Sequence, residues 1–340
     1  MLRFLLSIGM AVACLTPSFA TAQDAKPLRA GIIGLDTSHV VAFTRILHNP
    51  NAKGDLAGVR VVAAFPGGSP DIPASANRIE GFTKTLREQF GVEIVNSIDE
   101  LLQKVDVVLL ESVDGRPHLE QVRPVLKAGK PVFIDKPVAG SLTDAIQIYE
   151  LARQHKVPVF SSSSLRFNPG VQAAAKDPKL GGVLGCITYG PCSLEEHHPD
   201  LFWYGIHGVE MLFTIMGTGC ESVARVHTKD TDVVTGVWKD GRVGTFRGIR
   251  RGSAPYGAVV FGAKAVVVPD TKGGGYEPLV AEICKFFRTG KPPVSAEETL
   301  EIFAFMEAAD ESKRRGGAPV KLDEVMHQAR ARIPRLGGER

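Results

Sequence analysis

The chain has little net charge, few cysteines and no apolar run long enough to span a bilayer, and each shortage excludes a class of protein. Its 340 residues include 40 basic and 37 acidic side chains, so the formal net charge is only +3. Such a balance provides no positive field to hold a polyanion, and we therefore do not expect nucleic acid as a partner. The ordinary globular composition excludes a collagen-like, coiled-coil or largely disordered chain. At this length we expect two domains, each with its own core.

Cysteine is too sparse for a disulfide framework. The five cysteines show no CxxC spacing, and a chain of this length does not need such a framework to fold. Cys186 and Cys192 could pair if a hairpin brings them together. Otherwise we expect the cysteines to be small core residues.

The first 22 residues have the pattern of a secretory signal peptide. A basic start at Met1-Leu2-Arg3 precedes an apolar run from Phe4 to Leu15, and the small residues Ala20-Thr21-Ala22 follow. This pattern is typical of a segment that is removed on export. The apolar run is too short to span a bilayer as a helix, so we expect no stable membrane insertion after cleavage. A buried N-terminal helix is the alternative interpretation.

The type of export signal has consequences for any cofactor. The segment Ala11-Val12-Ala13-Cys14 only weakly resembles a lipoprotein cleavage box, because its first position is not Leu. There is no twin-Arg pair, so we predict Sec-type export of an unfolded chain to the periplasm or the extracellular space. A cofactor would then be acquired outside the cytoplasm.

Hydrophobic periodicity predicts two domains of different type. Over residues 27–164, apolar strand-like runs alternate with amphipathic helical runs, which indicates a doubly wound, parallel α/β sheet of the Rossmann type. Over residues 165–328, short strands bounded by Gly or Asp follow one another, with Lys239-Asp240-Gly241 as a hairpin turn. This part is expected to be an α+β domain with a mixed or antiparallel sheet. Residues 329–340 are basic and are expected to form a loose tail.

The turn after the first predicted strand departs from the dinucleotide-binding fingerprint. A GxGxxG motif would place Gly at Gly34, at Asp36 and at His39, and only Gly34 is present. Asp36 is compatible with a modified dinucleotide site, or with a carboxylate that caps the following helix and occupies its positive end. The acidic residue that would hold a ribose diol is also missing after the second strand. The segment Phe65–Ser69 stands there instead, either as an anion nest or as an ordinary surface turn.

The motif Asp135-Lys136-Pro137 is the stronger chemical signal. A residue before proline is biased out of the helical region, so Lys136 is expected to stay extended at the carboxyl edge of its strand. From there its ammonium group could bind a substrate hydroxyl and assist proton transfer. The alternative is a solvated lysine that merely follows a strand.

Several segments together resemble the Gfo/Idh/MocA family, the relatives of glucose-fructose oxidoreductase and inositol dehydrogenase. They are Asp135-Lys136-Pro137, the upstream His118 with the run from Leu126 to Val132, Arg166-Phe167-Asn168-Pro169, and Gly205-Ile206-His207. The resemblance implies a Rossmann domain followed by an α+β domain with a large open sheet. It also implies NAD or NADP as hydride carrier, sugars or cyclitols as substrates, and association into a homo-oligomer through the open sheet.

The resemblance also assigns site residues. Lys136 matches the family's active-site lysine, and His207 matches its late catalytic histidine. The predicted cofactor-binding residues are Gly34, Asp36, Thr37, Ser38, His39, Glu111, His118 and Asp135. The predicted substrate-binding residues are Arg166, Trp203 and Tyr204.

Two departures from the family pattern concern these residues. Trp203 stands where the family usually has Asp, four residues before His207, and offers a face for stacking on a sugar ring. The polar partner of His207 is then expected to be Tyr204 or Glu210. The segment Glu111–Asp114 adds negative charge near the expected nicotinamide position.

No metal site is predicted. The segment Glu195–Asp200 contains suitable ligand types, including His197 and His198, but adjacent histidines usually point apart and no helical i, i+4 pair is present. We interpret it as a solvated or substrate-rim loop.

Two functions remain open from the sequence. The first is an exported NAD(P)-dependent oxidoreductase that acts on a sugar or polyol hydroxyl, with a tightly held and recycled cofactor; a redox-neutral glycoside cleavage is a variant of it. The second is a non-redox carbohydrate-binding protein on the same scaffold, which Asp36, His39 and the missing ribose acid favour.

Overall fold

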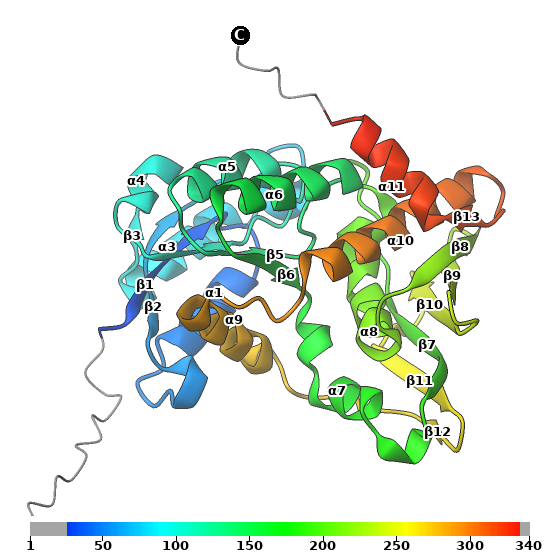
Figure 1. Cartoon of the computed structure of the whole chain (residues 1–340). Helices are drawn as coiled ribbons and strands as arrows, with labels where there is room; N and C mark the ends of the chain where they lie inside the picture. The colour runs from blue at the N-terminus through cyan, green and yellow to red at the C-terminus, as the bar shows by residue number, and fades with distance from the viewer. Residues whose placement is uncertain (1–25, 334–340) are drawn as a thin grey trace, which may run out of the picture.

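The computed structural model describes residues 26–333, and it contains two sheets with helices packed on them (Figure 1). The predicted signal peptide lies outside the described residues. Within 26–333, no helix has the length and apolar character needed to cross a bilayer. The four described cysteines are buried and free, so Cys186 and Cys192 do not pair.

The first sheet is parallel throughout, as predicted. Its order is β3-β2-β1-β4-β5-β6. The strands are β1 (Leu28–Ile33), β2 (Val59–Phe65), β3 (Glu93–Ile94), β4 (Val107–Leu110), β5 (Val132–Asp135) and β6 (Val159–Ser162). The order reverses at β1, which pairs with β2 on one side and β4 on the other. In such sheets ligands bind beyond the carboxyl ends of the strands at this reversal.

Helices cover both faces of this sheet, because its strands are apolar on both sides. On one face lie α4 (Ile98–Leu102), α5 (His118–Lys127) and α6 (Leu142–His155). On the other lie α1 (His39–Leu47), α3 (Ile79–Phe90) and α9 (Glu277–Thr289), while α2 (Pro73–Ala76) is a short helix after β2. The chain thus returns to the first domain with α9, whose Leu279, Ile283 and Phe286 join the core around Phe43.

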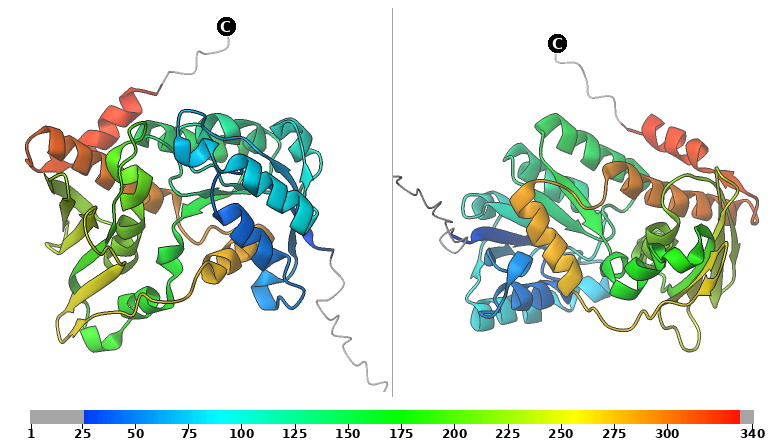
Figure 2. Two further views of the ribbon diagram at one scale, coloured as in Figure 1. Left: turned by 180° about the vertical axis from the view of Figure 1, so that it is seen from behind. Right: turned by 60° about the horizontal axis from the view of Figure 1, so that its bottom comes forward.

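The second sheet is mixed and open, as expected. Its order is β12-β11-β7-β10-β9-β8-β13, and β7 and β10 form its parallel pair. The strands are β7 (Val183–Pro191), β8 (Cys220–His227), β9 (Thr231–Trp238), β10 (Val243–Ile249), β11 (Gly257–Gly262), β12 (Val266–Val267) and β13 (Val320–Lys321). Both views of Figure 2 show this sheet at the end of the molecule away from β1 to β3.

The helices of the second domain pack against this sheet or against one another. They are α7 (Pro169–Ala175), α8 (Ile206–Met216), α10 (Ala296–Arg314) and α11 (Leu322–Ala331). Apolar side chains of α8 and α10 share one core with α5, α6 and the second sheet. The helix α11 continues to Ala331, so the first three residues of the segment expected to be a loose tail are helical.

Candidate active site

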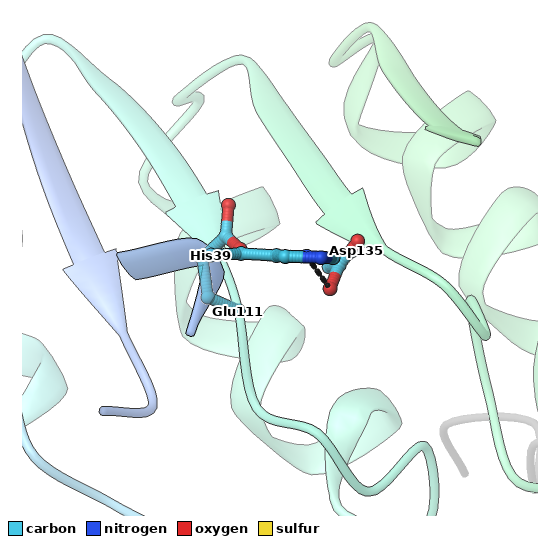
Figure 3. Close-up of side chains that lie close together, drawn as sticks. All are labelled: His39, Glu111 and Asp135. Carbon is cyan, nitrogen blue, oxygen red and sulfur yellow. Dashed lines mark hydrogen bonds and ion pairs between the residues drawn. The ribbon is translucent and has the colours of Figure 1, made fainter. Parts of the chain in front are cut away.

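The polar residues after β1, β4 and β5 meet at one edge of the first sheet. Figure 3 shows three of them: His39 at the start of α1, Glu111 directly after β4 and Asp135 at the end of β5. Lys136 follows Asp135. The parallel strands bring these residues together because their carboxyl ends share one edge.

Gly34 makes the tight turn between β1 and α1. Its φ is +86°, and a Cβ atom at this position would lie 2.5 Å from the backbone nitrogen of Ser112. Only glycine fits such a conformation and such a close approach. The first glycine of the predicted motif therefore has the structural role that a Rossmann turn requires.

Asp36 does not cap helix α1, which corrects one of the two interpretations from the sequence. The capping position is Ser38, and no side chain there bonds the helix N-terminus. Instead, the Asp36 carboxylate accepts a 2.9 Å hydrogen bond from the Val113 backbone N–H and a 2.6 Å bond from the Ser75 hydroxyl. Its exposure is 0%. Burial raises the pKa of this carboxyl above its usual value, and the two hydrogen bonds oppose that rise.

The loop after β2 is tied down beside Asp36. The Ser69 hydroxyl donates to Asp114 at 2.5 Å, and the Ser69 N–H donates to the Ser75 oxygen at 2.8 Å. Arg116 pairs with Asp114 and with Asp71 of the same loop, at 2.8 and 2.9 Å. The segment Phe65–Ser69, predicted as an anion nest or a surface turn, is therefore part of a loop fixed by side-chain hydrogen bonds and ion pairs. The Ser69 N–H already has a partner within the protein.

The pair His39–Asp135 is the central contact of the sheet edge. Nδ1 of His39 lies 2.7 Å from Oδ2 of Asp135, and the His39 ring stacks on Phe43 and meets the edge of the Tyr276 ring. Burial acts to raise the pKa of Asp135, but His39 and Lys136 outweigh it and lower that pKa. Glu111 has no such partner, and burial, with the charges of Asp135 and Asp36, raises its pKa well above the usual value despite Lys136.

Lys136 is not a solvated surface lysine. Its exposure is 6%, and the Lys136–Pro137 peptide bond is cis. Its charge acts on the buried imidazole of His207: burial, followed by the positive charges of Lys136 and His39, lowers the pKa of His207 well below its usual value. The structure thus brings the two predicted catalytic residues together, one from each domain.

The polar partner of His207 is Ser163, not Tyr204 or Glu210 as predicted. The Ser163 hydroxyl lies 2.7 Å from Nδ1 of His207. Glu210 instead pairs with Arg166 at 2.6 Å. Ser163 follows β6, so the same strand-edge rule that selects Lys136 could have identified it.

Aromatic rings flank His207. The Tyr204 ring lies 5.2 Å from the imidazole and is 37% exposed, and the Tyr256 ring lies 5.9 Å from it. Trp203 is half-buried and packs 5.5 Å from the ring of His198. Tyr204 is therefore the predicted substrate-binding residue that lies beside His207.

Two predicted site residues are engaged elsewhere. Arg166 is buried and its guanidinium pairs with Glu210 and Glu298, each at 2.6 Å, so its charge is already compensated inside the protein. The His118 ring is fully buried, with Nε2 2.9 Å from the Ser112 carbonyl and Nδ1 3.3 Å from the Val138 carbonyl. Both ring nitrogens of His118 are thus engaged, which corrects the expectation that this side chain is available to a ligand. Nη2 of Arg166, by contrast, is buried without a hydrogen-bond partner.

The adjacent histidines point apart, as expected, but only one of them is solvated. His197 is exposed and lies 3.0 Å from Glu195. His198 turns inward, where its Nε2 accepts a 3.3 Å hydrogen bond from the Gly115 N–H, and burial lowers its pKa to about 4. The two imidazoles therefore point to different surroundings.

The residues at the first turn differ from those of the usual pyrophosphate site. The position that should let a phosphate approach holds the Asp36 carboxylate, which already takes the Val113 N–H. Asp114 and Glu111 add negative charge beside it, whereas a pyrophosphate needs free donors and positive potential. The turn geometry at Gly34 is retained, and the Asp36 carboxylate takes up one backbone donor of the neighbouring loop.

Comparison with known proteins identifies the first domain. Residues 28–163 match the GFO_IDH_MocA model, described as an oxidoreductase family with an NAD-binding Rossmann fold. An uncharacterized oxidoreductase of Streptococcus pneumoniae is 29% identical over 125 residues, which are 35% of this chain and 34% of that protein. Inositol 2-dehydrogenase 3 of Saccharopolyspora erythraea is 26% identical over 181 residues, 50% of this chain and 48% of that protein. The chain thus spans half or less of the length of these curated relatives.

The likeness in three dimensions extends over both domains. The scyllo-inositol dehydrogenase of Lactobacillus casei, solved with NAD(H) and scyllo-inositol, superposes with a TM-score of 0.72 at 14% identity, covering 88% of this chain and all of that one. At this identity the likeness shows a common fold. The match thus places residues 28–163 in the Gfo/Idh/MocA oxidoreductase family, and the second domain shares the fold of the solved structure.

Proposed function

We propose that the protein is an NAD(P)-dependent oxidoreductase that acts on a hydroxyl-bearing carbon of a sugar or polyol. The observation that carries this proposal is that Lys136 of the first domain and His207 of the second are both buried, with the Lys136 charge acting on the His207 imidazole and the rings of Tyr204 and Tyr256 beside His207. The names of the relatives, which include an inositol dehydrogenase, support a polyol substrate.

The proton transfer is assigned to this pair. The Lys136 ammonium would donate a hydrogen bond to the reacting hydroxyl and favour its deprotonated form. His207 stays neutral because its pKa is lowered, so it is able to accept a proton as a general base. Ser163 holds one ring nitrogen of His207, and the rings of Tyr204 and Tyr256 provide the apolar and polar surface that sugar binding needs.

Export, a retained cofactor and self-association are further parts of the proposal. Residues 1–22 have the pattern of a signal peptide, and N-terminal sequencing of the mature protein from fractionated cells should begin at Gln23. Free NAD is scarce outside the cytoplasm, so we propose that one tightly held dinucleotide is recycled. The outer face of the second sheet exposes Leu184, Val226 and Val266 by 57–64%, which supports a homo-oligomer measurable by light scattering.

A second candidate is a non-redox carbohydrate-binding protein. The buried Asp36 carboxylate, which takes the Val113 N–H where a phosphate would need a donor, is the observation that favours it. Native mass spectrometry and nicotinamide fluorescence with added NADH or NADPH separate the two functions. A dinucleotide that co-purifies or binds when added, together with turnover of an inositol or a sugar from a substrate panel, supports the oxidoreductase. Sugar binding with no dinucleotide binding and no turnover supports the second candidate.

A further inference from the structure

Three side chains of the sheet edge form a compact set of metal-type ligands. One ring nitrogen of His39, one oxygen of Glu111 and one oxygen of Asp135 all lie within 4.8 Å of one another. Figure 3 shows that they come from the start of α1 and from the ends of two neighbouring strands, β4 and β5. Strands β4 and β5 are hydrogen-bonded neighbours in the first sheet, so the fold sets the spacing of the two carboxylates.

Three oxygens of this cluster lack a hydrogen-bond partner. They are both carboxylate oxygens of Glu111 and Oδ1 of Asp135, and the two residues are 0% and 1% exposed. A buried carboxylate without a partner is costly, and native proteins satisfy almost all such atoms. The cluster is therefore incomplete unless a proton or a cation lies among these oxygens.

The charges that face the cluster favour a cation. The groups that act on Glu111 are the carboxylates of Asp135 and Asp36 and the ammonium of Lys136. With all of these ionised, three carboxylates face the ammonium and, when it is protonated, the His39 imidazolium. Metal binding would displace the His39 proton and leave two negative charges in excess. A divalent cation would cancel this excess and at the same time give the free oxygens a partner.

We propose that His39, Glu111 and Asp135 bind a divalent first-row transition metal ion. The mixed set of one imidazole nitrogen and two carboxylates suits Zn²⁺, Mn²⁺ or Fe²⁺; it lacks the thiolates that Cu(I) prefers, and the imidazole disfavours the oxygen-seeking Ca²⁺ and Mg²⁺. The ion would bind between Nδ1 of His39 and Oδ2 of Asp135, which are now 2.7 Å apart. These two atoms would have to move apart by a few tenths of an ångström to accept it. Three protein ligands would leave coordination positions open to water or to a hydroxyl oxygen, as in catalytic sites.

The inference does not rest on the proposed function, because the ligands and their free oxygens are properties of the folded chain alone. A matched pair for comparison lies on the surface. Glu195 and His197 are 3.0 Å apart, His197 is exposed and Glu195 is half-buried, so this pair offers the same ligand types without a buried, unpartnered oxygen.

The test is metal binding to the purified full-length protein after removal of bound ions with a chelator. Calorimetric titration with ZnCl₂ or MnCl₂ should give one ion per chain, and Co²⁺ should show the visible absorption of a low-symmetry protein site. Glu111→Gln and His39→Ala should each weaken binding by about tenfold or more. The double variant Glu195→Gln, His197→Ala should bind as the unmodified protein does. Circular dichroism and thermal melting of Glu111→Gln, which keeps the shape of the side chain, check that the fold is retained.

Absence of stoichiometric binding by all three ions would overturn the proposal and would leave a proton as the partner of Glu111. Equal binding by Glu111→Gln and the unmodified protein would overturn it too, as would loss of binding in the surface double variant. None of these readouts uses turnover or NADH, so failure of the metal site and failure of the oxidoreductase proposal are seen separately.

Discussion

The Ser163 hydroxyl and Nδ1 of His207 lie 2.7 Å apart and join the end of β6 in the first domain to α8 in the second. The Ser163 oxygen also accepts the Leu165 N–H at 3.2 Å. These two contacts fix the position of the hydroxyl and, through it, the orientation of the imidazole. Ser163 is therefore a positioning residue for the proposed proton transfer.

Ser163→Ala is expected to lower kcat by about tenfold to hundredfold with little change in KM, because a misplaced base slows the reaction without removing substrate contacts. Steady-state kinetics on the substrate found in the panel measure this. Ser163→Thr, which keeps the hydroxyl, should recover part of the loss. Ser162→Ala is the control, since that hydroxyl donates to the Ser163 carbonyl and not to His207. An unchanged kcat in Ser163→Ala would contradict the positioning role.

The lowered pKa of His207 predicts a specific pH dependence. Burial and the charges of Lys136 and His39 keep the imidazole neutral below its ordinary value of 6.5, so the acid limb of kcat/KM should lie below pH 6.5. The folded state then binds fewer protons than the unfolded state between the two pKa values, and stability should fall as the pH drops below about 6.5.

Urea unfolding at several pH values and a pH–rate profile measure these two effects. His207→Gln cannot take up this proton, so it should lose less stability on acidification than the unmodified protein. An acid limb of kcat/KM centred above pH 6.5 is the outcome that would refute the assignment.

Lys136→Ala should abolish turnover while the fold is retained. Loss of a group that binds the reacting hydroxyl and assists its proton transfer costs about 10² to 10⁴ in rate. Lys127→Ala, which removes an exposed lysine at the end of α5, should leave the rate unchanged. If Lys136→Ala turns over the natural substrate at the normal rate, the catalytic role of Lys136 is wrong.

The sequence predicts the frame of the site better than its contacts. Strand and helix periodicity gives the parallel sheet, and the strand-edge rule places Asp135, Lys136 and the turn at Gly34 at its carboxyl end, where the structure has them. The open mixed sheet of the second domain, implied by the family resemblance, is also confirmed. These features depend on local patterns and on topology, which a single sequence carries.

Contacts between distant segments are not encoded in local patterns. Asp36 is 77 residues from Val113 and 39 from Ser75, and Ser163 is 44 residues from His207. The signal for the cluster of His39, Glu111 and Asp135 was nevertheless present, because all three residues stand at or just after strand ends. What the sequence could not supply is that Glu111 and Asp135 have buried oxygens without a hydrogen-bond partner.

Gly34→Ala is expected to destabilise the protein strongly. The φ of +86° disfavours any side chain, and the added Cβ would meet the Ser112 backbone at 2.5–2.6 Å. Strain of this kind costs about 1–3 kcal/mol, with the steric overlap in addition. Urea unfolding measures the loss. Gly91→Ala, at a positive φ but with open space around it, should cost less, and equal losses in the two variants would contradict the close approach of Ser112.

Asp36→Gly should create or strengthen dinucleotide binding. The substitution frees the Val113 N–H, removes a buried negative charge and restores the small residue that a phosphate needs at this turn. We expect the Kd of NADH or NADPH to fall by at least about tenfold, which corresponds to about 1.4 kcal/mol. Nicotinamide fluorescence titration measures it, with Asp99→Asn on the exposed start of α4 as the charge control. Asp36→Asn keeps an acceptor for the Val113 N–H without the charge. Its Kd for the dinucleotide should lie between those of Asp36→Gly and the unmodified protein. If Asp36→Gly binds the dinucleotide no better than the unmodified protein, the carboxylate is not what occupies the phosphate position.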